Sequence, residues 1–296
     1  MKFGGSSLGT GQRMLHVAGI IKEFSQKEQV VVVASAIYKV TDKLVSIFQK
    51  YKAENYKGAF EEIRLLYKIH KHALSDLGLP KEQHAHLEKV LTKLFGNLSI
   101  YLVVNNSYSV IDYDYCISFG ERLSSRLLAA ALRKIEINAK AIDASRVIIA
   151  NDDFSDAKVL IEETKIQVEK SLHPLFSQKV IPVITGFFAA TTSGEVITLG
   201  RGGSDYSATI LANVLDAKEV ILWKEVDGVY SGDPKKDKQA IFYPELTYQE
   251  ALSLAKTGAK VLHPEAMKPV ASKEIIVRVK NTFKPDFIGT KIWKGA

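Results

Sequence analysis

The sequence of 296 residues contains one cysteine, Cys116, and no long apolar run. A single cysteine cannot form an internal disulfide, which excludes a disulfide scaffold and favours a reducing compartment. Apolar stretches such as residues 30–34 and 180–184 are far too short to span a bilayer. Glycines and polar residues follow Lys2, so the start of the chain does not resemble a secretory signal peptide. We therefore expect a cytoplasmic protein without a membrane segment.

Several motifs of common enzyme classes are also missing. The chain has no G-x-x-x-x-G-K-[ST] segment and no G-x-G-x-x-G segment, which argues against P-loop proteins and dinucleotide-binding folds. It has no cluster of cysteines and histidines with metal-ligand spacing. The histidine pairs His70/His72 and His84/His86 are two residues apart, which places the members of each pair on different helix faces. We predict that these histidines lie at the surface and bind no metal.

The chain is basic, with a formal net charge of +7 and an isoelectric point near 9.1. Most of the surplus lies in residues 256–296, where eight lysines and one arginine face three acidic residues, an excess of +6. These lysines are spaced singly, as on a solvated surface, and do not form a polybasic run. A basic lobe attracts a small polyanion such as a nucleotide, and we favour that interpretation over DNA or RNA.

Short β-branched runs alternate with segments of helical periodicity. The runs are residues 29–36, 180–188, 219–223 and 274–279, and the helical segments include residues 14–24, 121–134, 204–215 and 248–255. This alternation predicts an α/β fold whose mainly parallel sheet is covered on both faces. Residues 43–98 show only helical periodicity and predict two or three inserted helices. A small polar stretch at residues 190–194 suggests a boundary between an N-terminal lobe, residues 1–194, and a C-terminal lobe, residues 195–296.

Two segments near predicted strand ends carry glycines beside charged side chains. In KFGGSS, residues 2–7, the glycines would let backbone N–H groups approach an anion, and Lys2 would add a positive charge. A loose N-terminal turn is the alternative. In TLGRGGSDYSA, residues 198–208, Ser204 or Asp205 fits a helix N-cap, and Arg201 suits a carboxylate or a phosphate. Asp205 could instead hold a metal or orient a lysine.

Three other segments allow a functional and a structural interpretation. In SFGERLSSR, residues 118–126, Glu121 either interacts with the helix dipole or faces a cleft and binds an ammonium group. In WKEVDGVYSGDP, residues 223–234, Tyr230 could stack on a ligand, although Gly-Asp-Pro is ordinary turn chemistry. In GAKVLHP, residues 258–264, His263 is most simply a packed histidine before a proline that starts a helix.

In this order, KFGGSS, SFGERLSS, LGRGGSDYSA, DGVYSGDP and GAKVLHP resemble aspartokinase, of the amino acid kinase superfamily. The resemblance implies a three-layer αβα sandwich with two lobes, with the amino-acid substrate in the N-terminal lobe and ATP in the C-terminal one. It also implies transfer of the γ-phosphoryl group of Mg-ATP to the side-chain carboxylate of L-aspartate, which gives 4-phospho-L-aspartate. That reaction begins the pathway to lysine and diaminopimelate, threonine and methionine. Positioning and cations suffice for phosphoryl transfer.

The resemblance also implies roles for individual residues. Lys2 would stabilise charge on the transferring group, Asp205 would orient Lys2 and the substrate, and Mg²⁺ would be held mainly by the ATP phosphates. The aspartate substrate would be bound by Thr41, Glu121, Arg201 and Ser204. The phosphates and the rest of ATP would be bound by Lys2, Gly4, Gly5, Ser6, Lys224, Glu225, Tyr230, Asp233, Lys235, Lys260 and Val261. L-Aspartate and ATP are thus the expected ligands, and we expect the protein to bind neither nucleic acid nor a membrane. A homodimer is possible.

The chain departs from the family pattern at three places. Lys224-Glu225 stands where the family commonly has Thr-Asp beside the adenine, and Lys235 stands where arginine is common. The chain stops at IGTKIWKGA, about where paired regulatory ACT domains would begin. We therefore expect either a catalytic region or a protein without that regulation. The alternatives to aspartate kinase are a kinase of the same fold for another carboxylate acceptor and a non-catalytic protein that binds nucleotide or amino acid.

Overall fold

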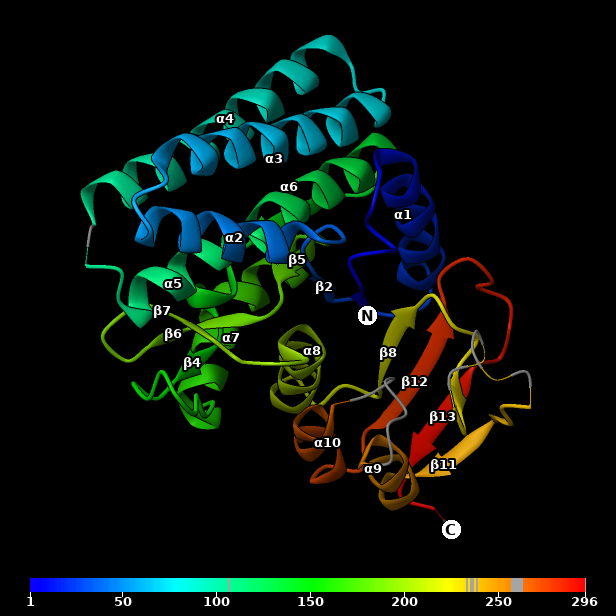
Figure 1. Cartoon of the computed structure of the whole chain (residues 1–296). Helices are drawn as coiled ribbons and strands as arrows, with labels where there is room; N and C mark the ends of the chain where they lie inside the picture. The colour runs from blue at the N-terminus through cyan, green and yellow to red at the C-terminus, as the bar shows by residue number, and fades with distance from the viewer. Residues whose placement is uncertain (106, 233, 235–236, 238, 257–262, 296) are drawn as a thin grey trace.

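The structure is a computed structural model that describes residues 1–105, 107–232, 234, 237, 239–256 and 263–295. Its central feature is an eight-stranded sheet (Figure 1). The strand order is β11 (Glu245–Thr247), β13 (Thr290–Trp293), β12 (Ile276–Asn281), β8 (Glu219–Lys224), β1 (Lys2–Phe3), β2 (Val32–Ala34), β5 (Ile181–Thr185) and β3 (Ala139–Ile142). Neighbouring strands are parallel except β12 and β13. The prediction of a mainly parallel sheet is confirmed.

The sheet separates two hydrophobic cores because successive side chains of each strand point to opposite faces. One core contains Val32 and Trp223, and the other contains Val33 and Leu222. The first core is completed by α1 (Gly11–Ser25) and α6 (Phe119–Lys134). The second is completed by α7 (Ile161–Ser177), α8 (Gly203–Val214) and α10 (Pro264–Ala271). Helices on both sides of one sheet make the three layers that the sequence predicts (Figure 1).

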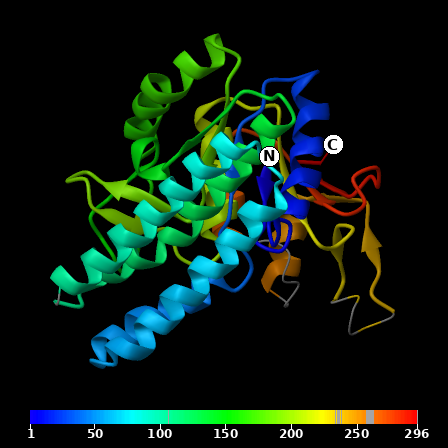
Figure 2. The ribbon, with the colours of Figure 1, turned by 90° about the horizontal axis from the view of Figure 1, so that it is seen from above.

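The inserted helices form a further layer outside α6 (Figures 1 and 2). They are α2 (Val40–Lys52), α3 (Tyr56–Asp76) and α4 (Lys81–Val104), followed by α5 (Val110–Ile117). Figure 2 shows α3 and α4 side by side, projecting away from the sheet. Three helices within residues 40–104 confirm the predicted helical insert.

The surface prediction for the histidines is wrong for His70. This side chain is fully buried, its Nδ1 atom lies 2.8 Å from the Leu66 carbonyl oxygen, and its ring centroid lies 5.6 Å from that of Phe95. Burial lowers the pKa of His70 to about 4. The reason is its position on the buried stripe of α3, one turn after Leu66, whereas the side chain of His72 is 78% exposed. The described residues contain no group of three or more potential metal ligands.

Smaller elements flank the main sheet. A three-stranded sheet has the order β4 (Ile149–Ala150), β6 (Phe188–Thr191) and β7 (Val196–Thr198), and a two-stranded one pairs β9 (Val229–Tyr230) with β10 (Phe242–Tyr243). The short helices are η1 (Ala144–Arg146) and α9 (Tyr248–Lys256). The run at residues 180–188 is therefore not one strand, because the chain leaves β5 at Gly186 and enters β6. Residues 190–194 cover the end of β6 and the turn that leads to β7, and the division into two lobes stays a prediction.

The order of the strands places the amino terminus in the middle of the molecule. β1 is hydrogen-bonded to β8 on one side and to β2 on the other, so Lys2 lies at the centre of the sheet.

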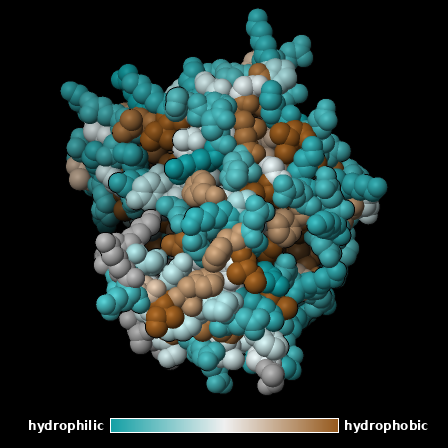
Figure 3. Space-filling model, turned by 90° about the vertical axis from the view of Figure 1, so that its right-hand side faces the viewer, coloured by the Kyte–Doolittle hydropathy of each residue, from teal (hydrophilic) through white to brown (hydrophobic). Residues whose placement is uncertain are grey.

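The side of the molecule seen in Figure 3 is mainly hydrophilic, with apolar side chains in separate small groups. Among the described residues, no helix is long and apolar enough to cross a membrane.

Candidate active site

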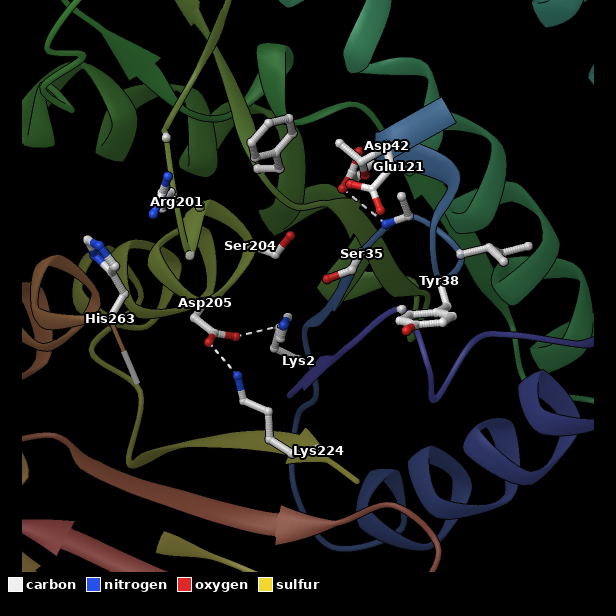
Figure 4. Close-up of a pocket in the computed structure, with 18 of the residues that line it drawn as sticks. Lys2, Ser35, Tyr38, Asp42, Glu121, Arg201, Ser204, Asp205, Lys224 and His263 are labelled. Carbon is white, nitrogen blue, oxygen red and sulfur yellow. Dashed lines mark hydrogen bonds and ion pairs between the residues drawn. The ribbon is translucent and has the colours of Figure 1, made fainter. Parts of the chain in front are cut away.

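Two lysines and one aspartate meet at the carboxyl ends of the central strands (Figure 4). The Nζ atom of Lys2 lies 2.7 Å from Oδ1 of Asp205, and the Nζ atom of Lys224 lies 2.5 Å from Oδ2 of the same carboxylate. Lys2 belongs to β1 and Lys224 ends β8, which are adjacent strands, while Asp205 comes from the first turn of α8. Ligands in open α/β sheets bind at the carboxyl ends of strands, so this group marks the site.

The start of α8 aims Asp205 at the lysines. The N-cap is Gly202, whose φ of 71° lies in the left-handed region that favours glycine. The helix begins at Gly203, and the N–H of Asp205 donates to the Gly202 carbonyl oxygen over 2.9 Å. The prediction that Ser204 or Asp205 caps this helix is therefore wrong. Because its carboxylate is not used in capping, Asp205 reaches across to β1 and β8.

Burial and charge oppose each other at Asp205. Burial alone would raise the pKa of its carboxyl group, but the ammonium groups of Lys2 and Lys224 outweigh that effect and lower it to about 2. Burial also lowers the pKa of Lys2, Lys224 lowers it further, and Asp205 raises it. The carboxylate is therefore ionised at neutral pH. When both lysines are protonated, the three groups carry a net charge of +1, which favours an anionic ligand.

The glycine turn after β1 is packed against backbone on two sides. A Cβ atom on Gly5 would lie 2.6 Å from the Ala36 carbonyl oxygen, so only glycine fits without a shift. The Gly5 carbonyl oxygen accepts from the N–H of Tyr38 over 3.2 Å, and the N–H of Gly4 donates to the Trp223 carbonyl oxygen over 3.4 Å. The alternative of a loose N-terminal turn is therefore wrong. Residues 4–6 lead toward α1, whose N-cap is Thr10.

Glu121 is a buried carboxyl group that faces the same space (Figure 4). It lies in the first turn of α6 with 3% exposure, and its Oε1 atom accepts from the N–H of Ala36 over 3.0 Å. Its Oε2 atom is buried without a hydrogen-bond partner among the described residues. Burial raises the pKa of Glu121 to about 8. A bound cation would both satisfy this oxygen and favour the ionised carboxylate.

A cavity of about 930 Å³ joins these groups. The predicted residues that line it are Lys2, Gly5, Thr41, Glu121, Arg201, Ser204, Asp205 and Lys224. Arg201 is exposed and lies within the glycine loop, between Gly200 and Gly202, before α8. The predicted residues Gly4, Ser6, Glu225 and Tyr230 are described but do not line the cavity. Asp233, Lys235, Lys260 and Val261 lie outside the described residues.

Several other side chains line the cavity without having been singled out for it in the sequence. They include Ser35, Tyr38, Lys39, Asp42, Phe187 and His263. The first four follow the carboxyl end of β2. Their position could have identified them from the sequence, because the segments that follow parallel strands at this edge of the sheet surround the ligand. His263 is the N-cap of α10 and is followed by Pro264 at the helix start, as the structural interpretation predicts.

The comparison with known proteins agrees with this geometry. A model of the amino acid kinase family matches residues 1–281. The chain belongs to the amino acid kinase family. It is 38% identical over 300 residues to aspartokinase 1, chloroplastic, of Arabidopsis thaliana, which covers 99% of this chain and 52% of that protein. It is 40% identical over 298 residues to aspartokinase 3, chloroplastic, of the same plant, again over 52% of that protein. The chain thus spans about half the length of these curated relatives.

Solved structures extend the likeness of this amino acid kinase to three dimensions. Aspartokinase III of E. coli in complex with aspartate and ADP superposes with a TM-score of 0.90 at 29% identity, over 100% of this chain and 64% of that one. Uridylate kinase of Archaeoglobus fulgidus superposes with a TM-score of 0.52 at 19% identity, a likeness of fold alone. The amino acid kinase fold is confirmed.

Proposed function

We propose that this amino acid kinase transfers the γ-phosphoryl group of ATP to the side-chain carboxylate of L-aspartate and forms 4-phospho-L-aspartate. One observation carries the proposal: Lys2, Glu121, Arg201 and Asp205, which span two hundred positions of the sequence, border a single cavity. The similarity to aspartokinases over 99% of the chain supports aspartate as the acceptor.

The amino-acid substrate needs one anionic and one cationic partner. The unpartnered oxygen of Glu121 would bind the α-ammonium group, and the guanidinium of Arg201 would bind the α-carboxylate. Thr41, in the first turn of α2, and Ser204, in the first turn of α8, line the same space with hydroxyl groups. This arrangement would direct the side-chain carboxylate of aspartate toward Lys2.

The transfer itself asks for positioning and charge stabilisation. An oxygen of the substrate carboxylate forms a bond to the γ-phosphorus, while the bond from that phosphorus to the bridging oxygen breaks and its electron pair stays on ADP. The carboxylate is already ionised, so no general base is required. Lys2 would stabilise the negative charge of the transferring group, and Asp205 would hold the ammonium of Lys2 in place.

The nucleotide would lie on the side of the C-terminal lobe, residues 195–296, with the amino acid on the side of residues 1–194. Gly4, Gly5 and Ser6 would hold phosphate oxygens, and the other proposed ATP-binding residues are Lys224, Glu225, Tyr230, Asp233, Lys235, Lys260 and Val261. Both oxygens of Asp205 are engaged by lysines, and the described residues contain no group of three metal ligands. Mg²⁺ held mainly by the ATP phosphates fits this donor set and would neutralise phosphate charge.

The wider assignments are part of the same proposal. We propose that the product serves synthesis of lysine and diaminopimelate, threonine or methionine, that the protein works in the cytoplasm, and that its ligands are aspartate and ATP, with neither nucleic acid nor membrane. We also propose that the protein can associate into a homodimer. The surplus of lysines in residues 256–296 is in keeping with attraction of an anionic nucleotide.

The test is an acceptor comparison with the 296-residue chain. Incubation with Mg-ATP and aspartate, glutamate or acetylglutamate, followed by hydroxylamine trapping, should give a hydroxamate with aspartate alone. A product with another acid would overturn the acceptor assignment. Calorimetry with Mg-ATP covers the non-catalytic alternative, since binding without any trapped product would favour it.

A further inference from the structure

Lys224 is held by its backbone beside the phosphate-binding turn. Its strand, β8, is paired with β1 on one side and with β12 on the other, and the Lys224 carbonyl oxygen accepts from the N–H of Thr282 over 2.9 Å. The preceding residue, Trp223, accepts from the N–H of Gly4. The Cα position of Lys224 is therefore fixed next to the glycine turn.

The side chain of Lys224 points into the site and not to solvent (Figure 4). It is 22% exposed and lines the cavity, and its Nζ atom contacts Asp205. An ammonium group has three N–H donors. Within the described part of the chain, Asp205 is the acceptor that it meets, which leaves donors for a ligand. The resemblance places this position beside the adenine, but the structure directs its charge at the carboxylate that also binds Lys2.

The charged groups follow an order across the cavity. Figure 4 shows Lys2 between Glu121 on one side and Lys224 on the other. If Glu121 lies on the side of the acceptor, whichever acid that is, and Lys2 contacts the transferring phosphoryl group, the groups next in line belong to the donor. The next group of ATP after the γ-phosphorus is the β-phosphate. Lys224 stands on that side.

We propose that Lys224 binds the β-phosphate of the nucleotide and that Asp205 positions both ammonium groups, one for each phosphate. This inference rests on the proposed use of ATP as the donor, but not on the identity of the acceptor. During transfer the bond between the γ-phosphorus and the bridging oxygen breaks, and its electron pair adds negative charge to the β-phosphate of ADP. The ammonium of Lys224 stabilises that charge and gives up no proton.

The test compares two nucleotides that differ by the β-phosphate. The variant Lys224→Met keeps a chain of similar length without the charge, and Asp205 keeps Lys2 as its partner. The control is Lys218→Met, just before the opposite end of β8, where the lysine is exposed and forms an ion pair with Glu28. Calorimetric Kd values for ADP and AMP are measured for the unsubstituted chain and both variants. In Lys224→Met we expect the ADP Kd to rise at least about tenfold, as loss of a charged hydrogen bond implies.

In Lys224→Met the AMP Kd should change by less than about twofold, because AMP has no β-phosphate to lose a contact. Lys218→Met should change neither the ADP Kd nor the AMP Kd. Equal rises for ADP and AMP would overturn the assignment to the β-phosphate, as would no change for either. If Lys224 only neutralised Asp205, Lys224→Met would leave the ratio of the two Kd values unaltered. A chain that binds ADP but gives no aspartyl phosphate would overturn the proposed acceptor and leave this inference standing. A chain that binds no ADP would overturn the inference itself.

Discussion

The carboxylate of Asp205 lies between the ammonium groups of two neighbouring strands, 2.7 Å from Lys2 and 2.5 Å from Lys224. The strands β1 and β8 are adjacent in the sheet although they are more than two hundred residues apart in the sequence. One helix-borne carboxylate thus fixes two cations at the edge where phosphates would enter.

Lys2→Ala should abolish most turnover and leave the fold intact. Loss of one preorganised donor to a developing charge lowers kcat by about 100-fold to 1,000-fold. Asp205 would still be paired with Lys224, so no unpaired carboxylate remains in the core. The measurement is the hydroxamate assay, with circular dichroism and thermal unfolding as the control for folding. A rate near that of the unsubstituted chain would refute the proposed catalytic role of Lys2.

Arg201→Lys should weaken aspartate binding more than ATP binding. A guanidinium binds a carboxylate through two parallel hydrogen bonds, and a lysine supplies a single point charge. We expect the KM for aspartate to rise about tenfold, equivalent to about 1.4 kcal/mol. The KM for ATP should stay within about twofold, since that shift corresponds to less than RT. Equal changes in both constants would contradict the assignment of Arg201 to the α-carboxylate.

The parts of the fold and site that could be predicted rest on local patterns. Valine-rich runs give β2 and β8 because a strand buried on both faces must be apolar throughout. The glycine-rich segment at residues 198–208 spans the predicted strand–helix junction between β7 and α8, and Arg201, Ser204 and Asp205 do line the cavity. Arg201 stands out there because a guanidinium suits a carboxylate or a phosphate. Ser204 and Asp205 also fit an ordinary helix cap, and their ligand roles come from the resemblance to aspartokinase.

The parts that could not be predicted depend on contacts between distant segments. The N-cap at Gly202 was missed because Ser204 and Asp205 are also good caps, and the lysines that draw Asp205 away come from other strands. The burial of His70 follows from packing of α3 in the helical layer, which a two-residue spacing does not reveal. The contact of Lys224 with Asp205 depends on β8 lying beside β1, an order that no local pattern encodes.

Glu121→Gln should change how stability depends on pH. The folded-state pKa of about 8 lies above the ordinary value, so the folded state holds the proton more tightly than the unfolded chain. The contribution of protonated Glu121 to the free energy of unfolding is fully present below about pH 4.5. It is lost as the pH rises to about 8. The unfolding free energy of the unsubstituted chain should therefore fall relative to that of Glu121→Gln between pH 5 and pH 8.

Urea unfolding at several pH values in this range measures that difference. The control is Glu163→Gln, which removes an exposed carboxyl group from the first turn of α7. The Glu121→Gln variant should also bind aspartate more weakly, because an amide does not neutralise an ammonium group. Parallel stability curves for the unsubstituted chain and Glu121→Gln would show that Glu121 is ionised within the folded protein without ligand.

His70→Gln should make the chain less sensitive to acid. The folded-state pKa of about 4 lies below the ordinary value near 6.5, so the unfolded chain binds the proton more tightly. The contribution of neutral His70 is present above about pH 6.5 and is lost as the pH falls to about 4, a difference of about 3 kcal/mol. Urea unfolding at pH 7 and pH 4.5 should show a smaller loss of unfolding free energy in His70→Gln than in the unsubstituted chain.

The matched control is His72→Gln, two residues away on α3 with an exposed side chain. This variant should lose as much unfolding free energy as the unsubstituted chain. An equal loss in all three proteins would mean that burial of His70 does not govern the acid sensitivity of the helical layer.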